Sequence, residues 1–215
     1  MEICRHTLYL IRHGETEWNA QKRLQGRRDI PLNEIGRQQA NNAGACLTWL
    51  NLDTANLDFL ASPLVRAQET MRSVRHQLGL DPTAYRTDDR LMEISFGKWE
   101  GLSWQHIQAE HPKEYRAHLA DPLELAIPGG ESWRMVFTRV AAVLKSLERD
   151  TLIVAHAGIL RACLKLQGGV DERLAPNLDI PQNRILIMRN GHFAWLQANS
   201  TPDGSQAMLS QTSPG

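Results

Sequence analysis

Two histidines and two arginines stand in the sequence where short apolar runs have just ended. Arg12 and His13 follow the first of these runs, Arg66 comes one helical turn after the second, and His156 follows the third. The guanidinium group of arginine is a planar fork of donors that matches the oxygens of a phosphate group. A neutral imidazole is a competent nucleophile near pH 7, since its unperturbed pKa is about 6.5. If the fold brings the four side chains together, they would suit the chemistry of a phosphoryl group.

The same residues suit a bound metal ion poorly. Neither histidine belongs to an HExxH or HxH pattern, and two arginines in one pocket would repel a cation. The three cysteines, Cys4, Cys46 and Cys163, form no CxxC pair, so we expect neither a structural zinc site nor a disulfide framework. We therefore predict a site that works without a metal or any other cofactor.

Three short, mainly apolar runs predict buried β-strands at residues 7–11, 57–61 and 151–155, and each is followed by a segment with helical spacing. Strands that alternate with helices predict a mostly parallel sheet covered on both faces, which is a three-layer α/β/α fold. In open parallel sheets, ligands bind beyond the carboxyl ends of the strands. The two histidines and two arginines therefore share one predicted edge of the sheet.

Local signals mark the ends of several predicted elements. Ser62 and Pro63 predict the start of a helix, with serine as the N-cap and proline at the first helical position. Gly79 is a suitable residue to end that helix. Asn190 and Gly191 stand between two apolar runs, and this dipeptide is a strong short-range signal for a β-hairpin.

The chain is predicted to form one domain with an insertion. Its 215 residues suit a single domain over residues 1–197. Residues 87–130 are rich in Trp, His and Pro and have weak periodicity, and a long irregular insertion in a compact α/β domain is typically a functional lid. The tail at residues 198–215, rich in Ser, Gln, Thr and Pro, is expected to be disordered.

Composition narrows the environment and the partners. Lys plus Arg equals Asp plus Glu, at 24 each, so no overall basic field favours nucleic acid as a partner. The amino-terminal apolar run is too short for a signal peptide, and no stretch approaches the roughly 20 apolar residues of a membrane span. We expect a cytoplasmic protein that does not bind membranes. The oligomeric state is left open, with a homodimer as the common state of soluble enzymes.

Six segments together resemble the signature motifs of the histidine phosphatase superfamily, the phosphoglycerate-mutase-like group, and within it branch 1. The segments, in chain order, are LIRHGETEWN from Leu10, RLQGRRDIPLNEIGRQQA from Arg23, SPLVRAQET from Ser62, LMEISFGKWEG from Leu91, PGGES from Pro128 and LIVAHAG from Leu152. They follow the family's order and spacing, and the resemblance covers residue 7 to about residue 196. It implies a phosphoglycerate-mutase-like fold, with a pattern most similar to that of broad-specificity bacterial phosphatases.

The resemblance also implies a mechanism through a phosphorylated enzyme. His13, by its place in the RHG motif, would attack phosphorus in line with the leaving oxygen. Arg12, Arg66 and His156 would hold the equatorial oxygens and stabilise the charge that develops on them. Glu93, by its place in the acid-loop motif, would protonate the departing alkoxide and then deprotonate the water that hydrolyses the phosphohistidine.

Further residues are expected near the phosphate or the rest of the substrate. The resemblance places three residues around the phosphate pocket, namely Asn19, Gln25 and Gly26. Aromatic residues of the predicted lid could form an apolar wall for bulky phosphate esters, or could instead pack the lid onto the domain, and these are Phe96, Trp99 and Trp104. Three cations could meet a second acidic group of a substrate, and these are Arg27, Arg28 and Lys98.

The expected function is the hydrolysis of small phosphate esters by a metal-independent phosphatase that forms a phosphohistidine on His13. The chain lacks the longer insertion typical of the mutases, and the acid loop LMEISFGKWEG resembles the phosphatase form. Four alternatives stay open: phosphoglycerate-mutase-type transfer, an α-ribazole-phosphate phosphatase, a non-catalytic phosphate-binding module, and a metallohydrolase that a chelator would inactivate.

Overall fold

The computed structural model describes residues 4–198, and a six-stranded sheet forms the centre of this part of the chain. The strands are β1 (Leu8–Arg12), β2 (Asp58–Ala61), β3 (Arg86–Thr87), β4 (Thr151–Ala155), β5 (Arg184–Arg189) and β6 (His192–Gln197). Their order is β3-β2-β4-β1-β5-β6. The first four strands in this order are mutually parallel, whereas β5 runs antiparallel to β1, and β6 antiparallel to β5. The three predicted strands are therefore present, and the sheet is mostly parallel as expected.

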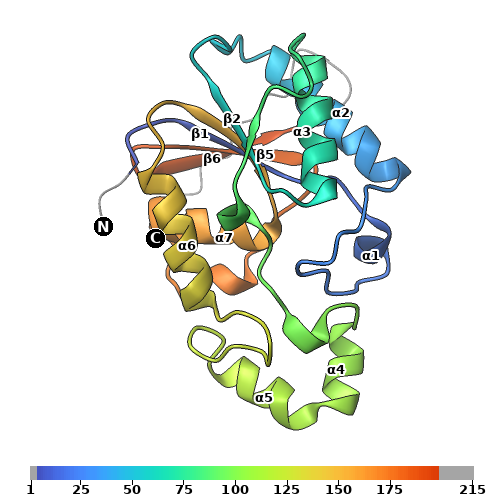
Figure 1. Ribbon diagram of the computed structural model, residues 1–215. Coiled ribbons are helices and arrows are strands. Elements are labelled where there is room, and N and C mark those ends of the chain that lie inside the picture. Colours follow the sequence, from blue (N-terminus) through green and yellow to red (C-terminus); the bar gives the residue numbers. More distant parts are fainter. Residues whose placement is uncertain (1–3, 199–215) are drawn as a thin grey trace.

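Helices cover both faces of this sheet (Figure 1). They are α1 (Glu17–Ala20), α2 (Glu34–Thr48), α3 (Val65–Gln77), α4 (Trp104–Glu110), α5 (Pro112–Ala120), α6 (Trp133–Lys145) and α7 (Ala157–Gln167), with 3₁₀ turns η1 (Asp89–Leu91), η2 (Gly97–Trp99) and η3 (Ala175–Asn177). Side chains alternate across each strand. Thus Leu8 and Leu10 of β1 share a core with α6 and α7, while Ile11 shares a second core with α2 and α3. These two cores complete the three-layer α/β/α fold.

Helix α3 begins later than its sequence signal indicates. Ser62 and Pro63 predict the start, yet the helix begins at Val65, with Leu64 at the N-cap position and no side chain capping it. The reason lies in the hydroxyl group of Ser62, which lies 2.7 Å from the Nε2 atom of His156. The same hydroxyl oxygen accepts from the amide of Leu64 at 3.3 Å, one residue before the helix, and it does not cap the helix itself.

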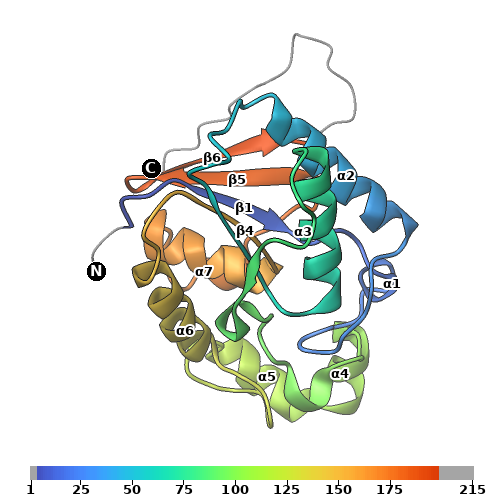
Figure 2. The same ribbon diagram turned by 45° about the horizontal axis from the view of Figure 1, so that its top comes forward.

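Two turns form as their sequences predict. Gly79 ends α3 with a φ of +70°, and its amide donates to the carbonyl of His76 at 3.0 Å. Asn190 and Gly191 connect β5 to β6 with φ values of +51° and +82°, the two positive values that a tight type I′ hairpin requires. Figure 2 shows the resulting pair of strands side by side, beyond β1. The hairpin thus extends the sheet on the side opposite β2 and β3.

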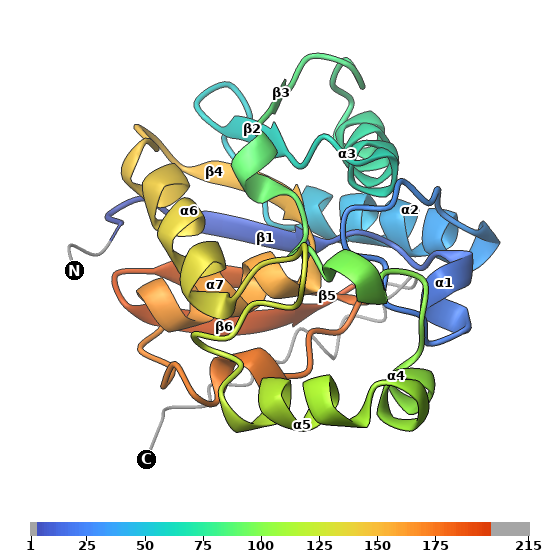
Figure 3. The same ribbon diagram turned by 60° about the horizontal axis from the view of Figure 1, so that its bottom comes forward.

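The predicted insertion at residues 87–130 contains the short helices α4 and α5 and has a small core of its own. That core is built from Trp99, Ile107 and Ile127, which are all buried. Figure 3 shows the lid helices apart from the sheet, joined to it by one segment from the end of β3 and one that returns to α6. The insertion is therefore a small packed unit attached to the main domain by two connections.

The start of the predicted tail belongs to the described fold. Ala198, the first residue of the predicted tail, is buried, and its amide donates to the carbonyl of Asn183 at 2.9 Å. At least this first residue of the predicted tail is therefore part of the fold, and residues 199–215 lie outside the described residues. Within residues 4–198, none of the helices is long and apolar enough to span a lipid bilayer.

Candidate active site

The predicted edge of the sheet gathers two histidines and an arginine. The amide of His13 continues the β1–β4 pairing by donating to the carbonyl of Ala155 at 2.9 Å, so His13 and His156 leave neighbouring strands side by side. Their ring centroids are 5.1 Å apart. The Nε atom of Arg66, in the first turn of α3, donates to Nε2 of His13 at 3.3 Å. Three residues from three separate elements thus meet at one point.

The ring of His13 is held in one tautomer. Its Nδ1 atom lies 2.7 Å from the carbonyl oxygen of Gly14, which can only accept, so Nδ1 carries the proton. Nε2 carries the lone pair, which accepts from Arg66. Burial lowers the pKa of His13 well below 6.5, and the positive charges of Arg66 and Arg12 lower it further. The ring is therefore neutral at pH 7, with Nε2 available as a nucleophile.

Arg66 is fully buried, and backbone carbonyls fix its orientation. Its Nη1 atom donates to the carbonyl of Arg28 at 2.7 Å, and Nη2 donates to that of Gly26 at 2.8 Å. Burial lowers the pKa of this guanidinium to about 10, against the opposing negative charges of Glu93, Asp29 and Glu100. Arg66 therefore stays charged at pH 7 and is rigidly aimed at Nε2 of His13.

Arg12 and His156 each bury a polar atom that has no hydrogen-bond partner in the described part of the chain. These atoms are Nε of Arg12 and Nδ1 of His156. The remaining atoms are anchored, since Arg12 Nη1 donates to the carbonyl of Ile180 at 2.6 Å and His156 Nε2 contacts Ser62. An unpaired buried polar group costs about 1–3 kcal/mol, which bonds to an anion would recover. Both side chains are thus suited to bind phosphate oxygens.

Glu93 lies at the amino-terminal end of α7. Its Oε1 atom accepts hydrogen bonds from the amides of Gly158 at 3.0 Å and Ile94 at 2.9 Å. His156 occupies the N-cap position of α7 but does not cap it, and a carboxyl oxygen of Glu93 accepts from the first turn of the helix instead. A Cβ atom at position 158 would collide with Oε1, so this approach requires glycine. The structure therefore places the candidate acid against Gly158, two residues after His156 in the chain.

Arg139 of α6 holds the loop that carries Glu93. Its Nη1 atom donates to the carbonyls of Arg90 at 2.6 Å and Met92 at 2.7 Å. Its Nε and Nη2 atoms bind the carboxylate of Glu131 at 2.9 and 3.0 Å. Sequence analysis did not single out Arg139, because it lies outside the six motifs on a helix that otherwise reads as an apolar face.

The three further pocket residues occupy different positions around His13. The carbonyl of Gly26 binds Arg66, and its φ of +51° suits glycine. Gln25 is buried, and its Oε1 atom has no partner among the described residues. Asn19 is linked to His13 through Gln182, whose Nε2 atom donates to Asn19 Oδ1 at 3.3 Å and to the carbonyl of His13 at 3.1 Å. Sequence analysis missed Gln182, since nothing in its neighbourhood marks it.

The lid aromatics do not form the predicted wall as a group. Trp99 is only 1% exposed, and its large apolar surface packs in the core of the lid. The prediction that Trp99 lines a substrate pocket is therefore wrong, and the alternative that it packs the lid holds. Phe96 is half-buried and meets Trp104 edge-on, with ring centroids 6.1 Å apart. Trp104 is 37% exposed and also stacks on His118. Of the three, Trp104 presents the most accessible surface.

The three cations considered for a second acidic group are already paired with carboxylates. Nitrogen to oxygen distances are 3.1 Å for Arg27–Glu131, 3.4 Å for Arg28–Glu100 and 3.0 Å for Lys98–Glu114. Their charges are therefore largely offset within the protein. Glu100 and Glu114 lie in the lid, and Glu131 directly follows it.

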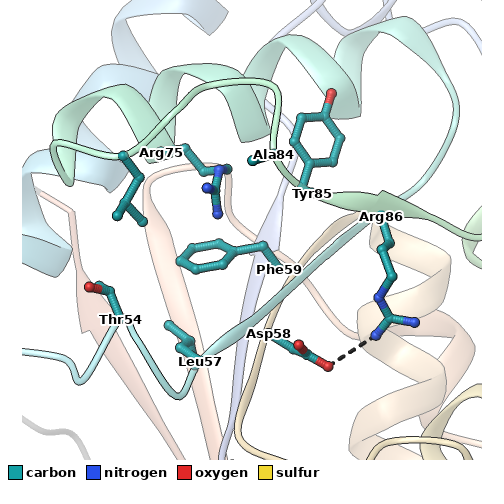
Figure 4. A pocket seen from close by; sticks show the side chains of 9 residues that line it. Thr54, Leu57, Asp58, Phe59, Arg75, Ala84, Tyr85 and Arg86 are labelled. Atoms are coloured by element: carbon teal, nitrogen blue, oxygen red, sulfur yellow. Dashed lines mark hydrogen bonds and ion pairs between the residues drawn. The ribbon is translucent and has the colours of Figure 1, made fainter.

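A surface cavity of about 460 Å³ lies away from this site (Figure 4). It is lined by Asp58 and Phe59 at the start of β2, whereas the histidines lie beyond the opposite ends of the strands. Arg75 lies over the Phe59 ring at 4.3 Å and donates from Nε to a backbone carbonyl, while Arg86 binds Asp58 at 3.0 Å. These charged groups have structural partners, so the cavity is not part of the candidate active site.

A neutral, buried histidine beside charged arginines and a second histidine suits phosphoryl transfer. Comparison with known proteins agrees, since the model of the histidine phosphatase superfamily (branch 1) matches residues 8–200. The chain belongs to this superfamily. In the described residues, no group of three or more His, Cys, Asp or Glu side chains is placed to hold a metal ion.

Similar proteins include both phosphatases and a probable mutase. Phosphoserine phosphatase 1 of Hydrogenobacter thermophilus is 30% identical over 169 residues, which cover 76% of this chain and 77% of that protein. A probable phosphoglycerate mutase of Salmonella choleraesuis is 35% identical over 162 residues, or 73% and 72% of the two chains. The crystal structure of a putative alpha-ribazole-5'-P phosphatase from Escherichia coli has a TM-score of 0.76 and 25% identity, covering 91% and 96%. These relatives support a phosphatase or mutase role.

Proposed function

We propose that the protein is a phosphatase that hydrolyses small phosphate monoesters through a phosphohistidine on His13, without a metal ion. The observation that carries the proposal is the state of the His13 ring. The bond from Nδ1 to the Gly14 carbonyl and the low pKa leave Nε2 unprotonated beside the charged Arg66. Such a ring can accept a phosphoryl group at neutral pH without a separate base.

In the first proposed step, Nε2 of His13 attacks phosphorus and the bond from phosphorus to the leaving oxygen breaks. Arg12, Arg66 and His156 bind the three equatorial oxygens, whose charge the two guanidinium groups balance. Glu93, entering this step as the carboxylic acid, passes its proton to the leaving oxygen, and the alcohol departs.

In the second step, the Glu93 carboxylate takes a proton from water as the water oxygen attacks phosphorus. The bond between phosphorus and Nε2 breaks, inorganic phosphate leaves, and His13 and Glu93 return to their starting states. A position at the start of α7, next to His156, suits Glu93 for both proton transfers. No step requires an oxidant, a reductant or a second substrate besides water.

The reaction class is supported more strongly than any particular ester. The names of the similar proteins suggest phosphoserine and α-ribazole 5′-phosphate as substrates to test. Trp104, at 37% exposed, is the most accessible of the three lid aromatics considered, which supports it as the one that would contact a bulky leaving group. We therefore include both esters, together with the aryl ester p-nitrophenyl phosphate, in the first assay.

The test compares wild type and His13→Ala, each with and without EDTA, for release of inorganic phosphate from these esters. We expect chelator-resistant turnover in wild type and none in His13→Ala, with an acid-labile phosphoenzyme trapped from wild type by rapid quenching. Loss of activity with EDTA would identify a metallohydrolase instead. Ester binding without turnover would identify a phosphate-binding module.

Mutase activity is the second candidate, and the probable phosphoglycerate mutase among the similar proteins favours it. The two activities differ in the fate of the phosphohistidine, which a phosphatase exposes to water and a mutase returns to an organic acceptor. Incubation with 3-phosphoglycerate and 2,3-bisphosphoglycerate distinguishes them. Release of inorganic phosphate faster than formation of 2-phosphoglycerate supports the phosphatase, and the reverse supports the mutase.

A further inference from the structure

Arg66 owes its orientation to a short turn that is distant from it in sequence. This turn, residues 25–28, is closed by a hydrogen bond of 3.0 Å from the amide of Arg28 to the carbonyl of Gln25. Two of its carbonyls, those of Gly26 and Arg28, accept from the two terminal nitrogens of Arg66. Any displacement of the 25–28 turn therefore displaces the guanidinium group that faces His13.

The carboxylate of Glu100 holds this turn from the lid side. Its Oε1 atom accepts from the amide of Arg27 at 3.0 Å, and its Oε2 atom lies 3.4 Å from Nε of Arg28. The Glu100 side chain is only 10% exposed. Gly26 approaches it so closely that a Cβ atom there would collide with Oε1. Backbone and side chain of the turn are thus both fastened to one carboxylate.

Other contacts between the lid and the turn do not replace this one. Glu131 binds the side chain of Arg27 at 3.1 Å but none of the backbone groups of the turn, and its carboxylate is also shared with Arg139. Backbone bonds join Leu24 to the lid just before the turn begins. Among the described contacts, Glu100 is therefore the lid side chain that grips the turn backbone.

Electrostatics reinforces the same arrangement. The negative charge of Glu100 is one of the groups that oppose the fall in the pKa of Arg66 caused by burial. The Glu100 carboxylate, which contacts Arg66 only through the 25–28 turn, thus supports both the position and the positive charge of the guanidinium group. It does so from the lid, a part of the chain separate from the strands that carry the histidines.

We propose that Glu100 is a positioning residue for phosphoryl transfer. Through the 25–28 turn, Glu100 fixes the orientation of Arg66. Phosphate binding by Arg66 therefore depends on the lid being packed against this turn. The proposal rests on the proposed function only where it predicts changes in phosphatase activity. Binding of inorganic phosphate tests the position of Arg66 without any turnover.

The experiment uses the full chain with Glu100→Ala and with Glu100→Gln, which keeps an acceptor for the Arg27 amide but removes the charge. The matched control is Glu114→Gln, which removes a comparable lid ion pair with Lys98 that does not touch the turn. Each variant is measured for p-nitrophenyl phosphate hydrolysis, for the Kd of inorganic phosphate and for thermal unfolding. Each is also combined with Arg66→Lys, since lysine lacks the fork that the two carbonyls bind.

We expect Glu100→Ala to lower kcat/KM by about 10- to 100-fold, the range for a displacement of about 1 Å near the reacting groups. Phosphate affinity should fall with it, Glu100→Gln should be milder, and Glu114→Gln should match wild type. In the Arg66→Lys background, Glu100→Ala should have little further effect, because the two changes act on one unit. If Glu100→Ala does not fold, Glu100→Gln in the same two backgrounds decides.

Two results would overturn the proposal. One is that the Glu100 variants keep the kcat/KM and the phosphate affinity of wild type. The other is an equal loss in the wild-type and Arg66→Lys backgrounds, which would indicate a merely structural role. Failure of the proposed function looks different. Wild type would then release no phosphate from any ester while still binding inorganic phosphate, and the Kd values would continue to judge Glu100.

Discussion

The carboxylate of Glu93 closes the amino-terminal end of helix α7, with its Oε1 atom 3.0 Å from the amide nitrogen of Gly158. Because this helix begins right after His156, one short segment positions both the candidate acid and a candidate phosphate ligand. The arrangement relies on the absence of a side chain at position 158. It allows the placement of the acid and its ability to carry a proton to be tested by separate substitutions.

Gly158→Ala should displace the candidate acid while leaving its chemistry intact. The added methyl group collides with Glu93 Oε1, so the carboxylate must move away from the start of α7. We expect kcat for alkyl phosphates to fall by about 10- to 100-fold. Steady-state kinetics measures this, with Ala157→Gly as a control that alters one methyl group at the same helix start. Equal kinetics of the Gly158 variant and wild type would contradict the placement.

Glu93→Gln should keep the side chain in the same position but remove the proton that it can donate. Glutamine keeps an oxygen that accepts from Gly158, so the cap of α7 is preserved. Loss of a general acid costs about 10²- to 10⁴-fold, and the loss should be concentrated in esters with poor leaving groups. The measurement is kcat/KM for a series of alkyl and aryl phosphates. A uniform loss across the series would show that Glu93 does not protonate the leaving oxygen.

Arg139→Met should destabilise the fold by about 3 kcal/mol, since breaking a buried ion pair leaves its partner charge uncompensated. The side chains of Arg139 and Glu131 are only 14% and 9% exposed, and two backbone carbonyls also lose their donor. Denaturant unfolding measures the change. Arg134→Met is the control, because its pairs with Glu124 and Glu172 are exposed and each is worth less than about 1 kcal/mol. Equal effects of the two substitutions would refute the prediction.

The free energy of unfolding should fall as the pH drops below about 6.5. Burial and the charge of Arg66 lower the pKa of both His13 and His156 in the folded protein, so the unfolded chain binds protons at a higher pH than the folded chain does. The stability that the neutral rings contribute is therefore complete above the unfolded pKa and is lost as the pH falls towards the folded pKa.

Denaturant unfolding of wild type and His13→Asn at pH 7.5 and pH 5.0 measures this dependence. The drop between the two pH values should be smaller in His13→Asn, because one of the two rings is gone. His76→Asn, at an exposed position, serves as the control and should behave as wild type does. An identical drop in all three proteins would show that His13 does not contribute.

The sheet and the gathering of His13, Arg66 and His156 could be predicted because both follow from local patterns. Apolar runs identify parallel strands, and the topology of such sheets brings their carboxyl ends to one edge. The position of Glu93 could come only from its resemblance to a family motif, since an acidic residue in a polar loop carries no signal of its own. Its contact with Gly158 depends on how the lid folds back.

Other features could not be predicted, because they depend on contacts between distant residues. Ser62 looked like a helix cap, but His156 engages its hydroxyl group. Trp99 could have lined a substrate pocket or packed the lid, because composition does not distinguish a core aromatic from an exposed one, and the lid core buries it. Gln182 reaches the carbonyl of His13 across 169 positions of the chain, a distance over which no local pattern operates.

The loop between α7 and β5 binds the first strand end, since the Ile180 carbonyl accepts from Arg12 and Gln182 donates to the His13 carbonyl. These partners follow Arg12 and His13 by 168 and 169 positions in the chain, so a ribosome adds them long after the first strand. A nascent chain that had emerged only to the end of α7 would contain His13 and Glu93. It would lack both the β5 neighbour of β1 and the partners that hold Arg12 and His13. Arg12 and His13 would therefore be held in place only after the loop before β5 had been synthesised and had packed against β1.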